Sequence, residues 1–144
     1  MSGAGDDAVS TAAFELRITA NAEHLQLVRG FVHESAMCLG CSAPTTDEVV
    51  RATEEACQNV IRYAYGGSAR RAITVTVGYS DTDLIVSVID TAPPIDSRAQ
   101  QSRPLDTTCP SGLGSHLIRA CVDEVVVDHS PEGGNRLKLV KRIA

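Results

Sequence analysis

The stretch from residue 73 to residue 89 restricts the possible folds more than any other part of this chain. From Ile73 to Tyr79, apolar residues alternate with polar or small ones, which is the period of a half-buried β-strand. Four polar residues, 80–83, then lead into the run 84–89, which is apolar at nearly every position. Two strands joined by so short a polar connection form a hairpin. Because the second strand is apolar on nearly both faces, we expect it in the centre of a sheet.

Two helices are expected between an N-terminal strand and this hairpin. Residues 14–18 alternate apolar and polar side chains, as a half-buried strand does. Asn21 can cap the helix that follows, which should end before Gly40. Thr46 is the expected cap of the second helix, and the glycine pair 66–67 its end. The apolar faces are Leu25, Val28, Phe31 and Val32 on the first helix, and Val49, Ala52, Ala56, Val60 and Ala64 on the second.

The C-terminal half adds one helix and two strands. Residues 91–111 contain four prolines and little periodicity, and a loop of that length in a compact domain is usually functional or disordered. A helix should follow Gly112 and Gly114, with strands near 125–127 and 136–139. The order βααββαββ predicts a two-layer α/β sandwich. We expect a mixed, mostly antiparallel sheet of about five strands, covered on one face by about three helices.

The composition is that of one soluble globular domain. The 144 residues suffice for a single core, and the formal charge of -5 gives no electrostatic reason to expect a nucleic-acid or membrane partner. No apolar run is long enough to cross a bilayer, and residues 1–11 lack the basic and apolar parts of a signal peptide. We therefore expect a flexible segment over residues 1–11, a single domain over 12–144 and a cytoplasmic location.

The five cysteines favour neither a disulfide framework nor a metal site. Their number is odd and nothing indicates secretion. Cys38 and Cys41 form a C-x-x-C pair, but the remaining cysteines and histidines offer no second pair with zinc-site spacing. Cys57 and Cys121 fall within helical apolar patterns, so we interpret them as small core residues.

Three polar side chains in otherwise apolar elements are candidates for chemistry. Glu55 and Asn59 are four residues apart on the second helix and therefore share a face, whereas Glu54 is expected at the surface. The acid can deprotonate a hydroxyl and the carboxamide oxygen can ligate Mg²⁺, although such a pair in isolation is more often a solvated face. Asp90 ends an apolar strand, where a buried carboxylate needs a donor. An adenine amino group or an Asx-type turn would provide one.

Two glycine-rich stretches add weaker signals. Gly112-Leu113-Gly114 precedes a helix, whose exposed amides and dipole suit a phosphate. No lysine follows as it does in the common phosphate loop, so the signal is weak by itself. Gly133-Gly134-Asn135 is a turn compatible with left-handed backbone, which alone indicates only a hairpin.

The order of these features is more specific than any one of them. Along the chain they run Glu-x-x-x-Asn on a helix, hairpin, strand-terminal Asp, long loop, Gly-Leu-Gly, strand, Gly-Asn, strand. This order resembles the GHKL ATPases, which include gyrase, heat-shock chaperone, histidine kinase and mismatch-repair types. Within that group the chain is similar to the bacterial anti-sigma-factor serine kinases. The similar blocks are TEEACQNVIRYAY (53–65), VSVIDTAPPID (86–96), SGLGSHLIRACVDEV (111–125) and GGNRLKLVKR (133–142).

The resemblance implies a role for each matching residue. Glu55 would be the general base toward the accepting serine, Asn59 the Mg²⁺ ligand, and Asp90 the partner of the adenine amino group. Residues 91–111 would close over ATP as a lid. Further nucleotide contacts would come from Ala92, Gly112, Leu113 and Gly114, and Gly134-Asn135 would support the adenine site.

The chain departs from the family pattern at three positions. Tyr63 stands where His is common, Ala92 where Gly is usual, and Pro110 where sporulation-type members often carry Arg. The Cβ of Ala92 could crowd the adenine, or restrict the backbone if a positive φ is needed. The cation missing at Pro110 removes a possible phosphate contact, for which Arg98 or Arg103 could substitute.

The resemblance implies a protein serine kinase that uses ATP and Mg²⁺ and acts as an anti-sigma factor. Its implied partners are a STAS-domain anti-anti-sigma protein, which it would phosphorylate, a sigma factor, and a second copy of itself. The alternative is a GHKL-fold binding module with weakened or no catalysis, which regulates a partner without phosphotransfer. A histidine kinase is poorly supported, because the chain has no room for a separate phosphoacceptor hairpin.

Overall fold

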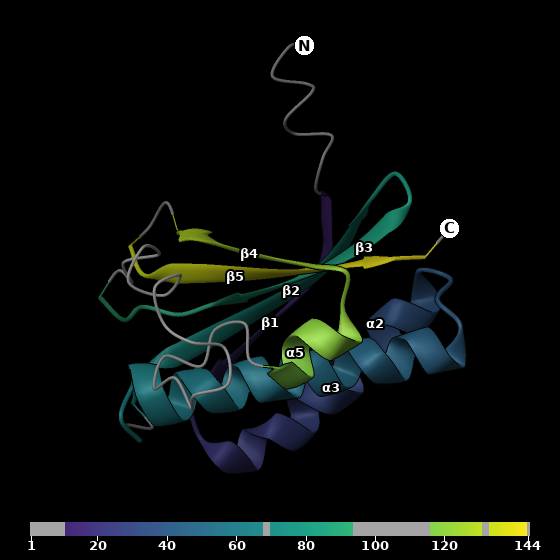
Figure 1. The fold of residues 1–144 in the computed structure, drawn as a ribbon. Coiled ribbons are helices and arrows are strands. Elements are labelled where there is room, and N and C mark those ends of the chain that lie inside the picture. Colours follow the sequence, from purple (N-terminus) through teal and green to yellow (C-terminus); the bar gives the residue numbers. More distant parts are fainter. Residues whose placement is uncertain (1–10, 68–69, 94–115, 131–132, 144) are drawn as a thin grey trace.

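The computed structural model describes residues 11–67, 70–93, 116–130 and 133–143 (Figure 1). Within these ranges the predicted order βααββαββ is confirmed. The strands are β1 (Thr11–Thr19), β2 (Ala72–Ser80), β3 (Asp83–Ile89), β4 (Glu124–His129) and β5 (Asn135–Arg142). The helices are α2 (Leu25–Cys38), α3 (Ala43–Asn59) and α5 (His116–Cys121), with short turns η1 (Ala22–His24) and η2 (Val60–Ala64).

The strands form one sheet in the order β1-β2-β3-β5-β4. Every described pairing is antiparallel, so the sheet lacks the parallel component that a mixed sheet would have. β3 is central, as its double-sided apolar pattern predicts. Its Val86 lies opposite Val77 of β2 on one side and Leu139 of β5 on the other.

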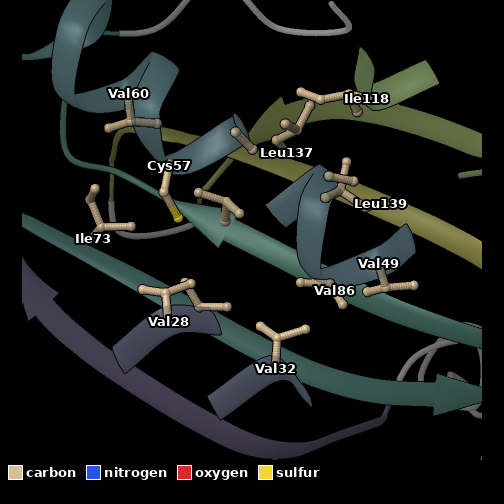
Figure 2. Packing of buried hydrophobic residues seen from close by; sticks show 14 of the residues in the cluster. Val28, Val32, Val49, Cys57, Val60, Ile73, Val86, Ile118, Leu137 and Leu139 are labelled. Carbon is tan, nitrogen blue, oxygen red and sulfur yellow. The ribbon is translucent and has the colours of Figure 1, made fainter. Parts of the chain in front are cut away.

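The helices cover one face of the sheet (Figure 1). α3 packs against β3 and β5 and lies between α2 and α5 in the helical layer. Figure 2 shows side chains of α2, α3 and α5 meeting the strands in one core, which includes Val28, Val32, Val49, Cys57, Val60, Ile73, Val86, Ile118, Leu137 and Leu139. Cys57 and Cys121 are both buried, as expected of core residues. Among the described helices, none combines the length and the apolar character that a bilayer span requires.

The second long helix begins earlier than its pattern predicts. α3 starts at Ala43, and the N-cap is Ser42, whose hydroxyl accepts a hydrogen bond from the Thr45 amide at 3.4 Å. Pro44 lies in the first helical turn, where its missing N–H costs nothing. The prediction of Thr46 as the cap is therefore wrong. Its side chain is fully buried, and its hydroxyl donates to the Met37 sulfur.

The end of α3 also departs from a plain helix. The five residues of η2 form a π-helical turn, closed by the Tyr65 amide donating to the Val60 carbonyl at 2.8 Å. A π turn holds one more residue than an α turn. Ala64, predicted on the apolar stripe, is consequently only half-buried, and Tyr65 takes the buried position. Gly66 and Gly67 then end the helix with positive φ, as predicted.

Candidate functional site

Asp90 lies directly after the central strand β3 and is 3% exposed. Its Oδ1 accepts hydrogen bonds from the Ala92 amide at 2.9 Å, from Asn135 Nδ2 at 3.0 Å and from the Asn135 amide at 3.3 Å. The bond to Ala92 is an Asx-type turn, and the expectation that this carboxylate needs donors is confirmed. Oδ2 accepts no hydrogen bond from a described residue. Oδ1 therefore binds groups of the protein itself, while Oδ2 is available to a ligand.

The backbone of Gly134 passes so close to Asp90 that no side chain fits between them. Gly134 has φ +96°, and a Cβ built on it would lie 1.9 Å from the Asp90 carbonyl oxygen. The Asp90 amide donates to the Asn135 carbonyl at 2.9 Å, and Asn135 Nδ2 donates to the Pro93 carbonyl at 3.1 Å. The structure thus brings the predicted Asp90, Ala92 and Asn135 together across 45 residues of sequence.

An ion pair braces the hairpin that carries Asn135. The Arg136 guanidinium of β5 donates to both carboxylate oxygens of Asp128 on β4, at 2.9 and 3.0 Å. This hydrogen bonding holds the pKa of Asp128 below its ordinary value and raises that of Arg136. Because Arg136 directly follows Asn135, this ion pair holds the start of β5 to the neighbouring strand β4.

Tyr65 joins this region from the helical layer, a role that the sequence analysis did not assign to it. Its hydroxyl donates to the Ala72 carbonyl at 2.6 Å, accepts from the Thr91 amide at 2.7 Å, and lies 3.1 Å from Thr91 Oγ1. The Arg71 guanidinium lies over the Tyr65 ring, 5.0 Å from its centroid, and donates to the Thr91 carbonyl at 3.1 Å. The only available signal was Tyr65 itself, a hydroxyl among apolar positions at the end of a helix.

Glu55 and Asn59 lie one turn apart on α3, as predicted. Asn59 is 3% exposed and ends the regular helix, directly before the π turn. Glu55 is half-buried, and no described residue forms a hydrogen bond or an ion pair with it. Glu54, expected at the surface, is instead paired with Arg29 of α2, and its side chain is 26% exposed. Of the two adjacent acids, Glu55 is the one left without a partner in the described structure.

The departures from the family pattern have different outcomes. Ala92 is buried, and Asp81 is the sole non-glycine residue with a positive φ in the described ranges, so the backbone restriction considered for Ala92 does not arise. Tyr63 is 37% exposed, with the Arg62 guanidinium over its ring. The phosphate-site candidates Gly112, Leu113 and Gly114 lie outside the described residues, as do most of the lid, Pro110, Arg98 and Arg103.

A family profile matches most of the chain. The profile of the Histidine kinase-like ATPase domain matches residues 18–141. The chain belongs to this family. Among curated relatives of this Histidine kinase-like ATPase domain is the anti-sigma F factor of Bacillus licheniformis, 28% identical over 108 residues, which cover 70% of this chain and 74% of the relative. Another is the serine-protein kinase RsbW of Bacillus velezensis, 27% identical over 121 residues, which cover 78% and 76%. The resemblance to anti-sigma-factor serine kinases is thus confirmed.

Solved structures show the same fold. The RsbU and RsbW domains of a Mycobacterium tuberculosis protein match with a TM-score of 0.60 and 20% identity, over 91% of this chain and 33% of that one. The catalytic domain of the histidine kinase ThkA matches with a TM-score of 0.56 and 16% identity, over 90% and 98%. The predicted GHKL-type α/β fold is confirmed.

Proposed function

We propose that this protein is an ATP-dependent protein serine kinase that acts as an anti-sigma factor by switching between partners. The observation that carries the proposal is the Asp90 carboxylate, which uses Oδ1 for three donors of the chain and leaves Oδ2 unbonded among the described residues. Relatives named anti-sigma F factor and serine-protein kinase RsbW support the same function.

Nucleotide recognition would begin at Asp90. Its Oδ2 would accept a hydrogen bond from the adenine amino group, while Asn135 and the Ala92 amide keep the carboxylate in place. A buried carboxylate that already has three donors need not reorganise to accept one more, so the site is preorganised for a donor on the base. Gly112, Leu113 and Gly114 would contact the phosphates, and residues 91–111 would cover them as a lid of the 12–144 domain.

Phosphoryl transfer would depend on α3. Glu55 has no partner among the described residues and would accept the proton of the serine hydroxyl as that oxygen attacks the γ-phosphorus. The bond from the γ-phosphorus to the β–γ bridging oxygen would break, and ADP would leave. Asn59 offers a carboxamide oxygen, a ligand type that suits Mg²⁺. Bound Mg²⁺ would neutralise charge on the ATP phosphates. Glu54 cannot substitute for Glu55 without losing its ion pair to Arg29.

The names anti-sigma F factor and serine-protein kinase support a sigma factor and a protein with an acceptor serine as the proposed partners. The acceptor would be a serine of a STAS-domain anti-anti-sigma protein, and the alternative partner would be a sigma factor. Phosphorylation of the STAS-domain protein and binding of the sigma factor would both take place in the cytoplasm. The protein would act as a homodimer. Kinase activity would decide which of the two partners is held.

Calorimetry of ATP with Mg²⁺ tests the nucleotide site. Asp90→Asn keeps an oxygen that can replace Oδ1 but puts an NH₂ donor in place of Oδ2, so adenine would meet a donor instead of an acceptor. We expect ATP affinity to fall at least tenfold, with little change in thermal stability. Asn59→Ala should remove the Mg²⁺ dependence of binding. Equal ATP affinity in wild type and Asp90→Asn would contradict the assignment of Asp90.

Phosphotransfer to candidate STAS proteins tests the kinase. Glu55→Gln should abolish phosphoserine formation while ATP still binds, because only proton acceptance is removed. Glu54→Gln, one residue away and lacking the charge that pairs with Arg29, is the matched control and should retain transfer. If wild type binds ATP but transfers no phosphate to any STAS protein tested, the alternative of a binding module without phosphotransfer is correct.

A further inference from the structure

We propose that Tyr65 is a positioning residue for nucleotide binding, which ties the Asp90 segment to the helix that carries Glu55 and Asn59. The inference rests on the proposed ATP site and assigns to it a residue that does not touch the nucleotide. Tyr65 lies after the π turn of α3 and is 6% exposed, yet its hydroxyl reaches both β2 and the residue after Asp90.

The hydroxyl of Tyr65 has no hydrogen-bonding capacity left. A tyrosine hydroxyl carries one proton and two acceptor sites. The proton is given to the Ala72 carbonyl at 2.6 Å, so the Thr91 amide at 2.7 Å and the Thr91 hydroxyl at 3.1 Å must both be donors to the oxygen. Tyr65 is therefore engaged wholly by the chain, in three directions, which is the arrangement of a structural clamp on Thr91.

The clamp acts on the backbone that aims the Asp90 carboxylate. The Thr91 amide is held by Tyr65 and the Thr91 carbonyl by Arg71, while the next amide, that of Ala92, is held by Asp90 Oδ1. The peptide groups before and after Thr91 are thus both held by hydrogen bonds to side chains. Because Asp90 and Thr91 are adjacent, freedom at Thr91 would pass directly into the direction of Asp90 Oδ2.

The π turn is what brings Tyr65 into place. An uninterrupted α-helix would keep Ala64 on the buried stripe, one turn after Val60, and would turn Tyr65 away from it. The extra residue in Val60–Ala64 rotates Tyr65 to the buried side, six residues after Asn59. The same helix therefore carries the proposed base, the proposed metal ligand and the clamp on the adenine side.

The test compares Tyr65→Phe with Tyr63→Phe, since Tyr63 is in the same segment but is exposed and forms no hydrogen bond through its hydroxyl in the described structure. Tyr65→Phe keeps the ring, and with it the Arg71 contact, and removes only the hydroxyl. ATP affinity measured by calorimetry should fall roughly three- to tenfold, the range for the net loss of a hydrogen bond. Tyr63→Phe should leave it unchanged.

A double-mutant cycle separates positioning from general stability. If Tyr65 acts through Asp90, Tyr65→Phe should weaken ATP binding in the wild-type background but have little further effect when Asp90 is already Asn. Equal effects in both backgrounds would overturn the inference, as would Tyr65→Phe and Tyr63→Phe proteins with the same affinity as wild type.

Amide exchange measured by NMR without nucleotide keeps the two proposals distinguishable. Loss of the Tyr65 hydroxyl should speed exchange of the Thr91 amide at least tenfold, with amides of β3 unchanged. An unchanged exchange rate of the Thr91 amide in Tyr65→Phe would overturn the clamp, whether or not ATP affinity changes. If Thr91 exchange rises but wild type binds no ATP, the clamp exists, while the nucleotide site and the role of Tyr65 in it are both wrong.

Discussion

At the scale of single residues, the site depends on how one carboxylate divides its two oxygens. Asp90 Oδ1 accepts three N–H donors, two of them from Asn135. An Asx-type turn and an adenine contact were alternatives in the sequence, yet the geometry makes them compatible, because the turn occupies Oδ1 alone. The close passage of Gly134 over Asp90 is what allows Asn135 to reach that oxygen.

A series of glycine substitutions tests this close passage. Gly134→Ala would place a Cβ 1.9 Å from the Asp90 carbonyl oxygen at φ +96°, so we expect a loss of at least about 3 kcal/mol in the free energy of unfolding. Gly133→Ala has φ +91° but open space, and should cost only about 1 kcal/mol. Gly30→Ala, in helix α2 with open space, should stabilise by about 0.5–1 kcal/mol.

Urea denaturation of the three variants measures these differences. Similar costs for Gly133→Ala and Gly134→Ala would mean that positive φ alone matters and that the two backbones do not approach closely. A loss of stability in Gly30→Ala would contradict the open surroundings of that position.

The sequence predicted some of these residues and not others, for identifiable reasons. Asp90 was predictable because a carboxylate at the end of a strand that is apolar on both faces must find donors. The contact between Asp90 and Asn135 came only with the resemblance, since 45 residues separate them. Tyr65 was not predictable, because its position depends on a π turn and the apolar pattern of 49–64 reads equally well as an uninterrupted α-helix.

At the scale of elements, helix existence was predicted better than helix boundaries. α3 was expected to begin near Thr46, since Thr is a good cap and Asp47 and Glu48 follow it. Ser42 is an equally good cap, and Pro44 is favoured in a first turn. Two adequate signals four residues apart cannot be ranked by local preference alone. Tertiary structure distinguishes them, because Thr46 is fully buried and its hydroxyl donates to the Met37 sulfur.

Paired substitutions at these two positions measure which residue caps the helix. Ser42→Ala should cost about 0.5–1 kcal/mol of unfolding free energy, at the lower end for a cap because the bond is 3.4 Å long. Thr46→Val keeps the buried volume and loses only a weak bond to sulfur, so it should cost less than Ser42→Ala. Thermal denaturation gives the ranking, and the reverse order would restore Thr46 as the cap.

At the scale of the whole molecule, one core joins both layers, and the pattern of apolar residues was sufficient to predict it. The central position of β3 followed from its double-sided apolar run, and one-sided helical stripes implied helices on a single face. Relative strand order beyond the hairpin did not follow, because nothing local says that β5, rather than β4, pairs with β3. Hydrogen-bond pairing between distant strands is decided by the assembled fold.

The titration of Cys57 reports on the integrity of that core. Cys57 is fully buried between helix and sheet (Figure 2), and burial, aided by the charge of Glu54, raises its pKa to about 12. The unfolded chain ionises its thiols near pH 9, so it binds fewer protons than the folded protein above that pH. The contribution of Cys57 is thus fully present below pH 9 and is lost between about pH 9 and pH 12, by about 1.4 kcal/mol per pH unit.

Comparison with Cys57→Ala isolates this thiol from the lysines and tyrosines that titrate in the same range. The variant has a constant packing cost but no thiol, so its disadvantage relative to wild type should shrink steadily as the pH rises above about 9. Cys38→Ser, which changes an exposed thiol at the end of α2, is the control for loss of a thiol outside the core. Unfolding free energies from urea titrations at each pH decide the matter. A pH-independent gap for Cys57→Ala would mean that Cys57 ionises within the folded protein, and hence that the packing between α3 and the sheet opens without global unfolding.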